Sequence, residues 1–145
     1  MGVYVAKETV KLLIHAGRPV RNAQVLVLGA AFKENVPDVR DTRVKELVEE
    51  LQSFGCQVEV CDPIVLESDR RYIPAPFVDD PFRTRRGHYD AVVLAVPHRT
   101  FRERTYGDYL TLMSALAQGL FVDVKGVYLS DARADISGRV LYWNL

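Results

Sequence analysis

The sequence offers little that would draw it to nucleic acid or to a membrane. Its 19 basic and 19 acidic residues cancel, so no net field attracts the chain to a polyanion or an anionic surface. A small basic cluster, Arg83, Arg85 and Arg86, lacks the interleaved aromatic side chains on which bases stack. Residues 1–18 show no signal-peptide pattern, and no apolar run reaches the about 18 residues of a membrane span. We therefore expect a soluble, cytoplasmic protein that binds a small ligand or another protein.

Cysteine and histidine are also scarce. Cys56 and Cys61 match neither a CxxC pair nor a disulfide framework, so we expect two reduced, partly buried thiols. The three histidines, His15, His88 and His98, are far apart in the sequence and form no HxxxH pattern. No metal site is predicted.

Strand and helix patterns alternate along the chain. With 145 residues, 48% of them hydrophobic, the chain can bury one substantial core but is too short for two full domains. Continuous apolar runs, typical of strands buried on both faces, occur at 24–29, 58–61, 90–96 and 119–124. Helical spacing occurs at 3–15, 44–54 and 109–117, and the proline-containing stretch 64–87 reads as a variable connection with one short helix. This order predicts an α/β, Rossmann-like three-layer domain with a mostly parallel sheet, preceded by an amphipathic helix.

The turn after the first predicted strand is the first candidate ligand site, because ligands bind outside the carboxyl ends of parallel strands. A dinucleotide-binding unit would show GxGxxG there, but Ala31 stands in place of its second glycine and the third glycine is missing as well. Lys33 and Arg40 instead offer cationic side chains that could hold phosphate oxygens. The competing interpretation is a pair of solvated loop charges.

The other strand ends offer weaker signals. Asp62 stands where an acidic residue often binds a ribose hydroxyl, although an Asp-Pro turn explains it equally well and is favoured. His98 follows the third strand without a serine or cysteine partner that would make it catalytic. Lys125 follows the fourth strand and could face Lys33 across the same edge of the sheet.

Taken together, these segments resemble a known family. The strings VLVLGAAFKENVPDVRDTR, VEVCDP, YDAVVLAVPHRTF and VDVKG occur in this order and resemble the carboxyl-terminal, UDP-binding domain of the UDP-glucose/GDP-mannose dehydrogenase family. The likeness is greatest to its bacterial UDP-N-acetylhexosamine 6-dehydrogenases. The resemblance implies that residues 1–18 are the end of a central helical region, which fits a first helix without a cap. Residues 19–145 would then be the Rossmann-like UDP-sugar-binding domain.

The family resemblance also assigns roles to four side chains. Phe32 would pack near the uridine, and Lys33 and Lys125 would contact the UDP portion of the substrate. Arg40 would reach the pyrophosphate of NAD held by the amino-terminal domain. The family's catalytic cysteine and its glycine-rich turn belong to parts that precede Met1, so we expect no catalytic residue here.

The resulting hypothesis is a nucleotide-sugar-binding domain of an NAD-dependent UDP-sugar 6-dehydrogenase of polysaccharide biosynthesis, which oxidises UDP-glucose or a UDP-N-acetylhexosamine to the uronic acid. Alone the chain would be inactive and would hold no cofactor; its partners would be the UDP-sugar and the missing NAD-binding and central domains. An exposed apolar side of the first helix could also make a homodimer. The alternative is a free-standing nucleotide-binding regulatory module that pairs with another chain, with a first helix capped and packed on its own sheet. An autonomous NAD-binding unit is disfavoured by the missing glycines.

Overall fold

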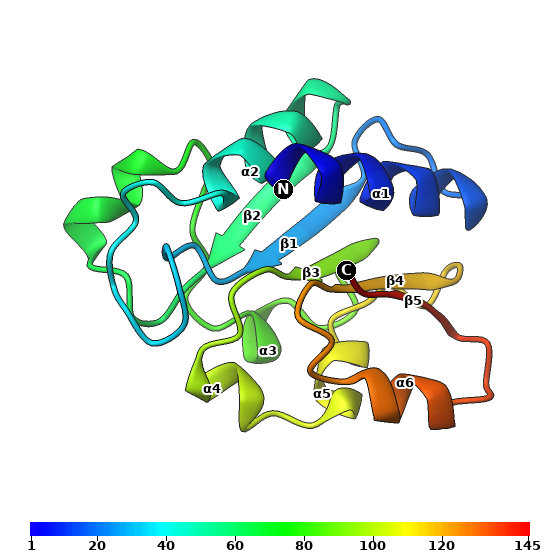
Figure 1. Cartoon of the computed structure of the whole chain (residues 1–145). Helices are drawn as coiled ribbons and strands as arrows, with labels where there is room; N and C mark the ends of the chain where they lie inside the picture. The colour runs from blue at the N-terminus through cyan, green and yellow to red at the C-terminus, as the bar shows by residue number, and fades with distance from the viewer.

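A five-stranded parallel sheet is the centre of the computed structural model, which describes residues 1–145 (Figure 1). The strands are β1 (Gln24–Leu28), β2 (Gln57–Cys61), β3 (Ala91–Leu94), β4 (Gly119–Asp123) and β5 (Val140–Trp143). Their order is β2-β1-β3-β4-β5, and every neighbouring pair is parallel. The Rossmann-like α/β fold and the four expected strands are therefore confirmed. The edge strand β5 was not expected.

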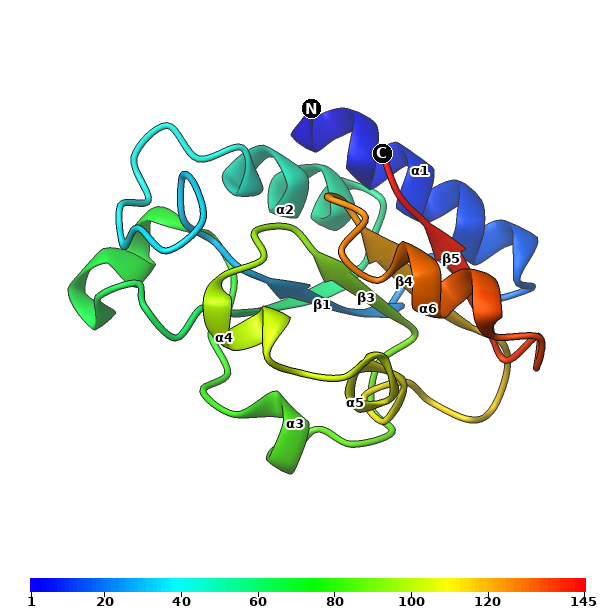
Figure 2. The ribbon, with the colours of Figure 1, turned by 60° about the horizontal axis from the view of Figure 1, so that its bottom comes forward.

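Helices cover both faces of the sheet (Figures 1 and 2). One face carries α1 (Gly2–His15) and α2 (Val44–Ser53). The opposite face carries four short helices, α3 (Pro81–Thr84), α4 (Arg99–Arg102), α5 (Tyr106–Leu110) and α6 (Leu129–Ala134). Alternate strand residues point to the two cores: Val25 and Val27 pack with α1 and α2, whereas Leu26 and Leu28 pack with aromatic residues of the short helices. None of the helices has the length and apolarity to cross a bilayer.

The first helix is part of the same core as the sheet. It buries Val5, Val10 and Leu13 against α2 and the strands, and Tyr4 lies beside Trp143 of β5, with 6.2 Å between ring centroids. Its first turn has no side-chain cap, as expected, and Ile14 at its end is exposed. The helix thus combines an uncapped start with a packed face.

The prediction of a helix at 109–117 is wrong. The helix is shorter and starts earlier, because Thr105 and Asp108 form a capping box in which each side chain accepts a hydrogen bond from the other residue's amide. After Leu110 the chain runs in turns. The connection 64–87 likewise holds two short elements, a 3-10 helix (Glu67–Tyr72) and α3, instead of one.

The turns after α5 are held by Arg18. Its guanidinium donates to the carbonyl oxygens of Ser114, Ala117 and Gln118 at 3.2, 2.9 and 2.7 Å and pairs with Asp90 at the start of β3. These bonds stabilise the segment in a non-helical path. They also close the amino-terminal end of the sheet, opposite the ligand side.

Gly29 allows the ends of β1 and β3 to come together. Its φ is +89°, and a Cβ atom there would lie 2.4 Å from the carbonyl oxygen of Val96. Any side chain would therefore push apart the two strand ends. Gly138 has a similar φ of +71° but open space around it.

We expect Gly29→Ala to lower the free energy of unfolding by clearly more than the roughly 1–2 kcal/mol that a left-handed conformation alone costs a non-glycine residue. Gly138→Ala is the matched control, which carries the backbone strain without the steric clash. Chemical denaturation of the two variants measures the difference. Equal losses would show that the close approach of β1 and β3 is not needed.

Candidate functional site

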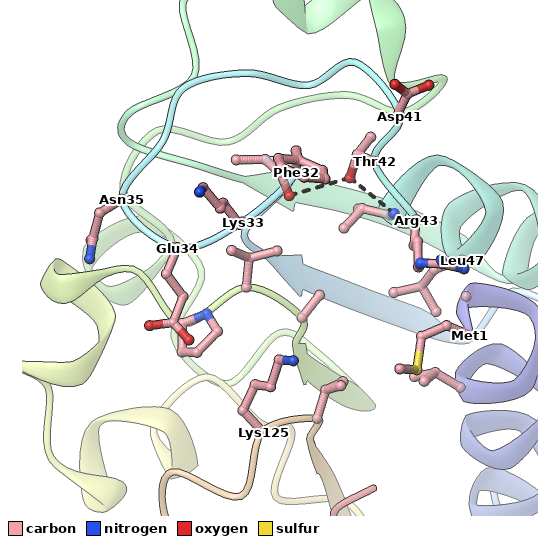
Figure 3. A pocket seen from close by; sticks show the side chains of 18 residues that line it. Met1, Phe32, Lys33, Glu34, Asn35, Asp41, Thr42, Arg43, Leu47 and Lys125 are labelled. Atoms are coloured by element: carbon pink, nitrogen blue, oxygen red, sulfur yellow. Dashed lines mark hydrogen bonds between the residues drawn. The ribbon is translucent and has the colours of Figure 1, made fainter.

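A cavity of about 820 Å³ lies at the carboxyl ends of the strands (Figure 3). Five segments line it: the start of α1, the β1–α2 loop, the first turns of α2, the turn after β3 and the turn after β4. Of the sequence-predicted residues, Phe32, Lys33 and Lys125 line this cavity and Arg40 does not. Figure 3 shows Lys33 and Lys125 on either side of the chain that follows β3. The prediction that these two lysines share one edge of the sheet is confirmed.

The charges around the cavity favour an anion. Neither Lys33 nor Lys125 takes part in an ion pair within the chain. Glu34 also lines the cavity, but its carboxylate is paired with Arg102, at 3.2 Å from each oxygen. Arg43, at the start of α2, adds a third cation to the lining. Sequence reasoning missed Arg43, although its place directly before the helix predicted at 44–54 could have indicated it.

The β1–α2 loop is fixed to the strand ends by Asp62. This carboxylate is buried after β2 and accepts four backbone hydrogen bonds. Ala30 and Ala31 donate to one oxygen at 2.7 and 3.1 Å, and Ile64 and Val65 donate to the other at 3.0 and 3.2 Å. Asp62 is therefore a structural residue, and a ribose hydroxyl could not reach it. The Asp-Pro turn interpretation is the one the structure supports.

His98 completes this arrangement as a buried structural side chain. Its Nε2 lies 2.8 Å from Asp62, and its Nδ1 accepts a hydrogen bond from the Asn35 amide at 2.9 Å. Because a backbone N–H can only donate, these bonds assign the neutral tautomer with the proton on Nε2. Burial alone would raise the pKa of Asp62, but the bonds from His98 and from the Ala30 and Ile64 amides outweigh burial and hold that pKa below its ordinary value of 3.8.

The far part of the loop is shaped by its own side chains. Asn35 has a φ of +62°, and its side-chain oxygen accepts a bond from the amide of Arg99 at 2.8 Å. The Thr42 hydroxyl donates to the carbonyl of Ala31 and accepts from the amide of Val44, so it links the start of the loop to α2 (Figure 3). These hydrogen bonds restrain the two parts of the loop that line the cavity, residues 31–35 and 41–43.

Arg40 lies on the exposed part of the same loop. Its guanidinium binds both oxygens of Asp38 at 3.0 Å, and this contact lowers the pKa of Asp38. The pair is solvent-exposed and contributes little to stability. Arg40 can therefore leave Asp38 for another anion at little cost in free energy.

The two cysteines are free and buried, as predicted, and neither lines the cavity. Burial raises the pKa of Cys56 to about 11 and that of Cys61 to about 12. Both are therefore thiols rather than nucleophilic thiolates at neutral pH. No group of three or more histidine, cysteine, aspartate or glutamate side chains is arranged to hold a metal ion.

Asp62→Asn should lower stability at neutral pH by about 1–3 kcal/mol, because an amide cannot accept from all the donors that surround this side chain. Since the folded-state pKa of Asp62 is depressed, its contribution is present above the ordinary aspartate pKa and is lost as the pH falls through the folded-state pKa. Urea denaturation of both proteins from about pH 7 to pH 3 should show the gap narrowing below about pH 4. A gap that stays constant to pH 3 would mean that the Asp62 charge does not stabilise the fold.

Comparison with known proteins gives a consistent result. The family model of the UDP-glucose/GDP-mannose dehydrogenase family, UDP binding domain, matches residues 26–130. The UDP-N-acetyl-D-glucosamine 6-dehydrogenase of Salmonella typhi is 39% identical over 105 residues, which are 71% of this chain and 24% of that protein. Protein CapL of Staphylococcus aureus is 36% identical over 146 residues, covering 100% of this chain and 32% of its own length.

Solved structures share the fold. The NDP-N-acetyl-D-galactosaminuronic acid dehydrogenase from Methanosarcina mazei Go1 has a TM-score of 0.80 at 24% identity, over 99% of this chain and 28% of its own. The UDP-glucose dehydrogenase from Pyrobaculum islandicum has a TM-score of 0.67 at 26% identity, over 97% and 29%. The chain thus spans about a quarter to a third of the length of these relatives. It belongs to the UDP-glucose/GDP-mannose dehydrogenase family and contains the family's UDP binding domain.

Proposed function

We propose that the cavity holds the UDP portion of a UDP-sugar, and that the chain is the substrate-nucleotide domain of an NAD-dependent UDP-sugar 6-dehydrogenase. The observation that carries the proposal is the meeting of Lys33 and Lys125 at one cavity of a UDP binding domain. Residues 1–18 are then the end of the enzyme's central helical region, and residues 19–145 are the UDP-sugar-binding domain.

The diphosphate is the part of the ligand that the cavity suits best. Lys33 and Lys125 supply two positive charges that no carboxylate of the chain neutralises, and an ammonium binds phosphate oxygens as a point charge. The cavity also borders the start of α2, where the amide dipoles favour an anion. Arg43 adds further positive charge.

The nucleoside is the part that the apolar lining suits. Phe32 is 54% exposed despite its large ring, and it stands on the cavity beside Lys33, where it packs near the uridine. Val44, Leu47 and Val124 form an apolar wall. A volume of about 820 Å³ lies within the range of cavities that hold ligands of this size.

NAD does not fit this chain by itself. The turn after β1 lacks the glycines that let a backbone approach a pyrophosphate. Arg40, on the exposed part of the β1–α2 loop outside the cavity, is the residue to which we assign a contact with that group. NAD supplies the hydride acceptor in the whole enzyme, bound by another domain, and Arg40 contributes to its pyrophosphate from outside. The chain holds the substrate and helps to exclude water, and it has no nucleophile of its own.

Because the chain belongs to this family, we favour this function over that of a free-standing regulatory module. No observation supports the regulatory module. The packed face of α1 agrees with either function. Homodimer formation through exposed Val3, Tyr4 and Ile14, the cytoplasmic location and a role in polysaccharide biosynthesis remain predictions.

Lys33→Ala should weaken binding of UDP or UDP-N-acetylglucosamine by about ten- to hundredfold, because it removes a charge-assisted contact worth about 1.5–3 kcal/mol. Calorimetric titration of the chain measures the affinities. Lys11→Ala, which removes the same charge from an exposed site on α1 outside the cavity, should bind as the parent does. Equal affinities for the parent and Lys33→Ala would contradict the proposed site.

NAD should not bind the chain at concentrations where the uridine ligands do, since the dinucleotide fingerprint is absent. The same calorimetric titration with NAD tests this expectation. NAD binding without uridine-ligand binding would instead indicate an autonomous dinucleotide fold.

A further inference from the structure

The loop that carries Phe32 and Lys33 is held at both ends by one buried pair of side chains. We propose that His98 and Asp62 are positioning residues for the nucleotide site: they fix the backbone on either side of Lys33 so that its ammonium meets the diphosphate. This inference rests on the proposed function and extends it to residues that do not line the cavity.

Asp62 fixes the first end of this segment. It accepts the amides of Ala30 and Ala31 at 2.7 and 3.1 Å, immediately before Phe32. The carboxylate is 2% exposed, so water does not compete for these bonds. The loop therefore leaves β1 in one direction.

His98 fixes the second end. Its Nδ1 accepts the Asn35 amide at 2.9 Å, two residues after Lys33, while its Nε2 donates to Asp62 at 2.8 Å. The ring is 1% exposed and stacks on Phe101 at 5.9 Å between centroids. Because Asp62 fixes the direction of the Nε2–H bond, the acceptor nitrogen is left facing Asn35.

Lys33 has no side-chain bond of its own to fix its place. The other restraints near Lys33 are the backbone bond from Phe32 to Asp38 at 2.7 Å, the exposed pair of Glu34 with Arg102 and the exposed bond from the Arg99 amide to the Asn35 side chain. Exposed pairs contribute little. The bond to His98 joins the loop backbone itself to a buried side chain, and we assign it the larger part of the restraint on this side of Lys33.

Two substitutions of His98 separate positioning from plain stability. His98→Phe keeps an aromatic ring that can stack on Phe101 but is larger than imidazole and removes both hydrogen bonds, whereas His98→Gln keeps one donor and one acceptor. Amide hydrogen exchange at Asn35 reports the bond itself, and calorimetry with UDP-N-acetylglucosamine reports the site. His98→Met, whose flexible side chain packs readily, serves as a second apolar variant if phenylalanine does not fit.

We expect His98→Phe to speed exchange at Asn35 and to weaken ligand binding about tenfold, with His98→Gln close to the parent in both measurements. In a Lys33→Ala background most of the loss caused by His98→Phe should disappear, because residues that act through one contact are not additive. The control is Asp90→Asn, which disturbs the partly buried bonds to Arg18 and Gln24 at the other end of the sheet. It should lower stability without changing affinity or exchange at Asn35.

The inference is overturned if His98→Phe speeds exchange at Asn35 but binds as tightly as the parent. An equal loss of affinity with and without Lys33 would overturn it too, because the effect would then not pass through that side chain. Failure of the unmutated chain to bind any uridine ligand would contradict the proposed function first, and the present inference with it. The two failures are thus told apart by the parent protein alone.

Discussion

The buried carboxylate of Asp62 joins three strand ends that would otherwise be independent turns. It follows β2, accepts amides from the turn after β1, and binds His98 in the turn after β3. A buried charge is tolerated only when hydrogen bonds compensate for its lost hydration, and here four amides and an imidazole do so. The lowered pKa of Asp62 expresses that balance. The cavity depends on this arrangement, because the loop that carries Phe32 and Lys33 starts there.

The two ends of the sheet differ in kind. At the amino end Arg18 and Asp90 form an ion pair, and the Arg18 guanidinium also donates to nearby carbonyl oxygens. This end is therefore closed and structural. At the carboxyl end Asp62 is buried in hydrogen bonds and Glu34 is paired with Arg102, while Lys33, Arg43 and Lys125 line the cavity without an ion pair and outnumber the one unpaired carboxylate there, Asp41. The cavity therefore favours an anion at the end where parallel sheets bind ligands.

Local patterns predicted most of the sheet and the first two helices, since buried runs and helical spacing are properties of neighbouring residues. They also brought Lys33 and Lys125 to one cavity, because parallel strands end at one edge; the binding roles of these residues and of Phe32 and Arg40 stay predictions. The sequence did not predict β5, a half-buried edge strand, or the early end of α5, which depends on Arg18 far along the chain. The bond of Asp62 to His98 was missed for the same reason: it joins residues that are 36 positions apart.

The most direct test of the account is a crystal structure of the chain with UDP-N-acetylglucosamine. The account predicts the diphosphate between Lys33 and Lys125, with the uracil near Phe32 and with the Asn35 amide still bound to His98. A ligand seated elsewhere, such as the polar hollow beside Gln24 and Gln57 at the opposite end of the sheet, would contradict it.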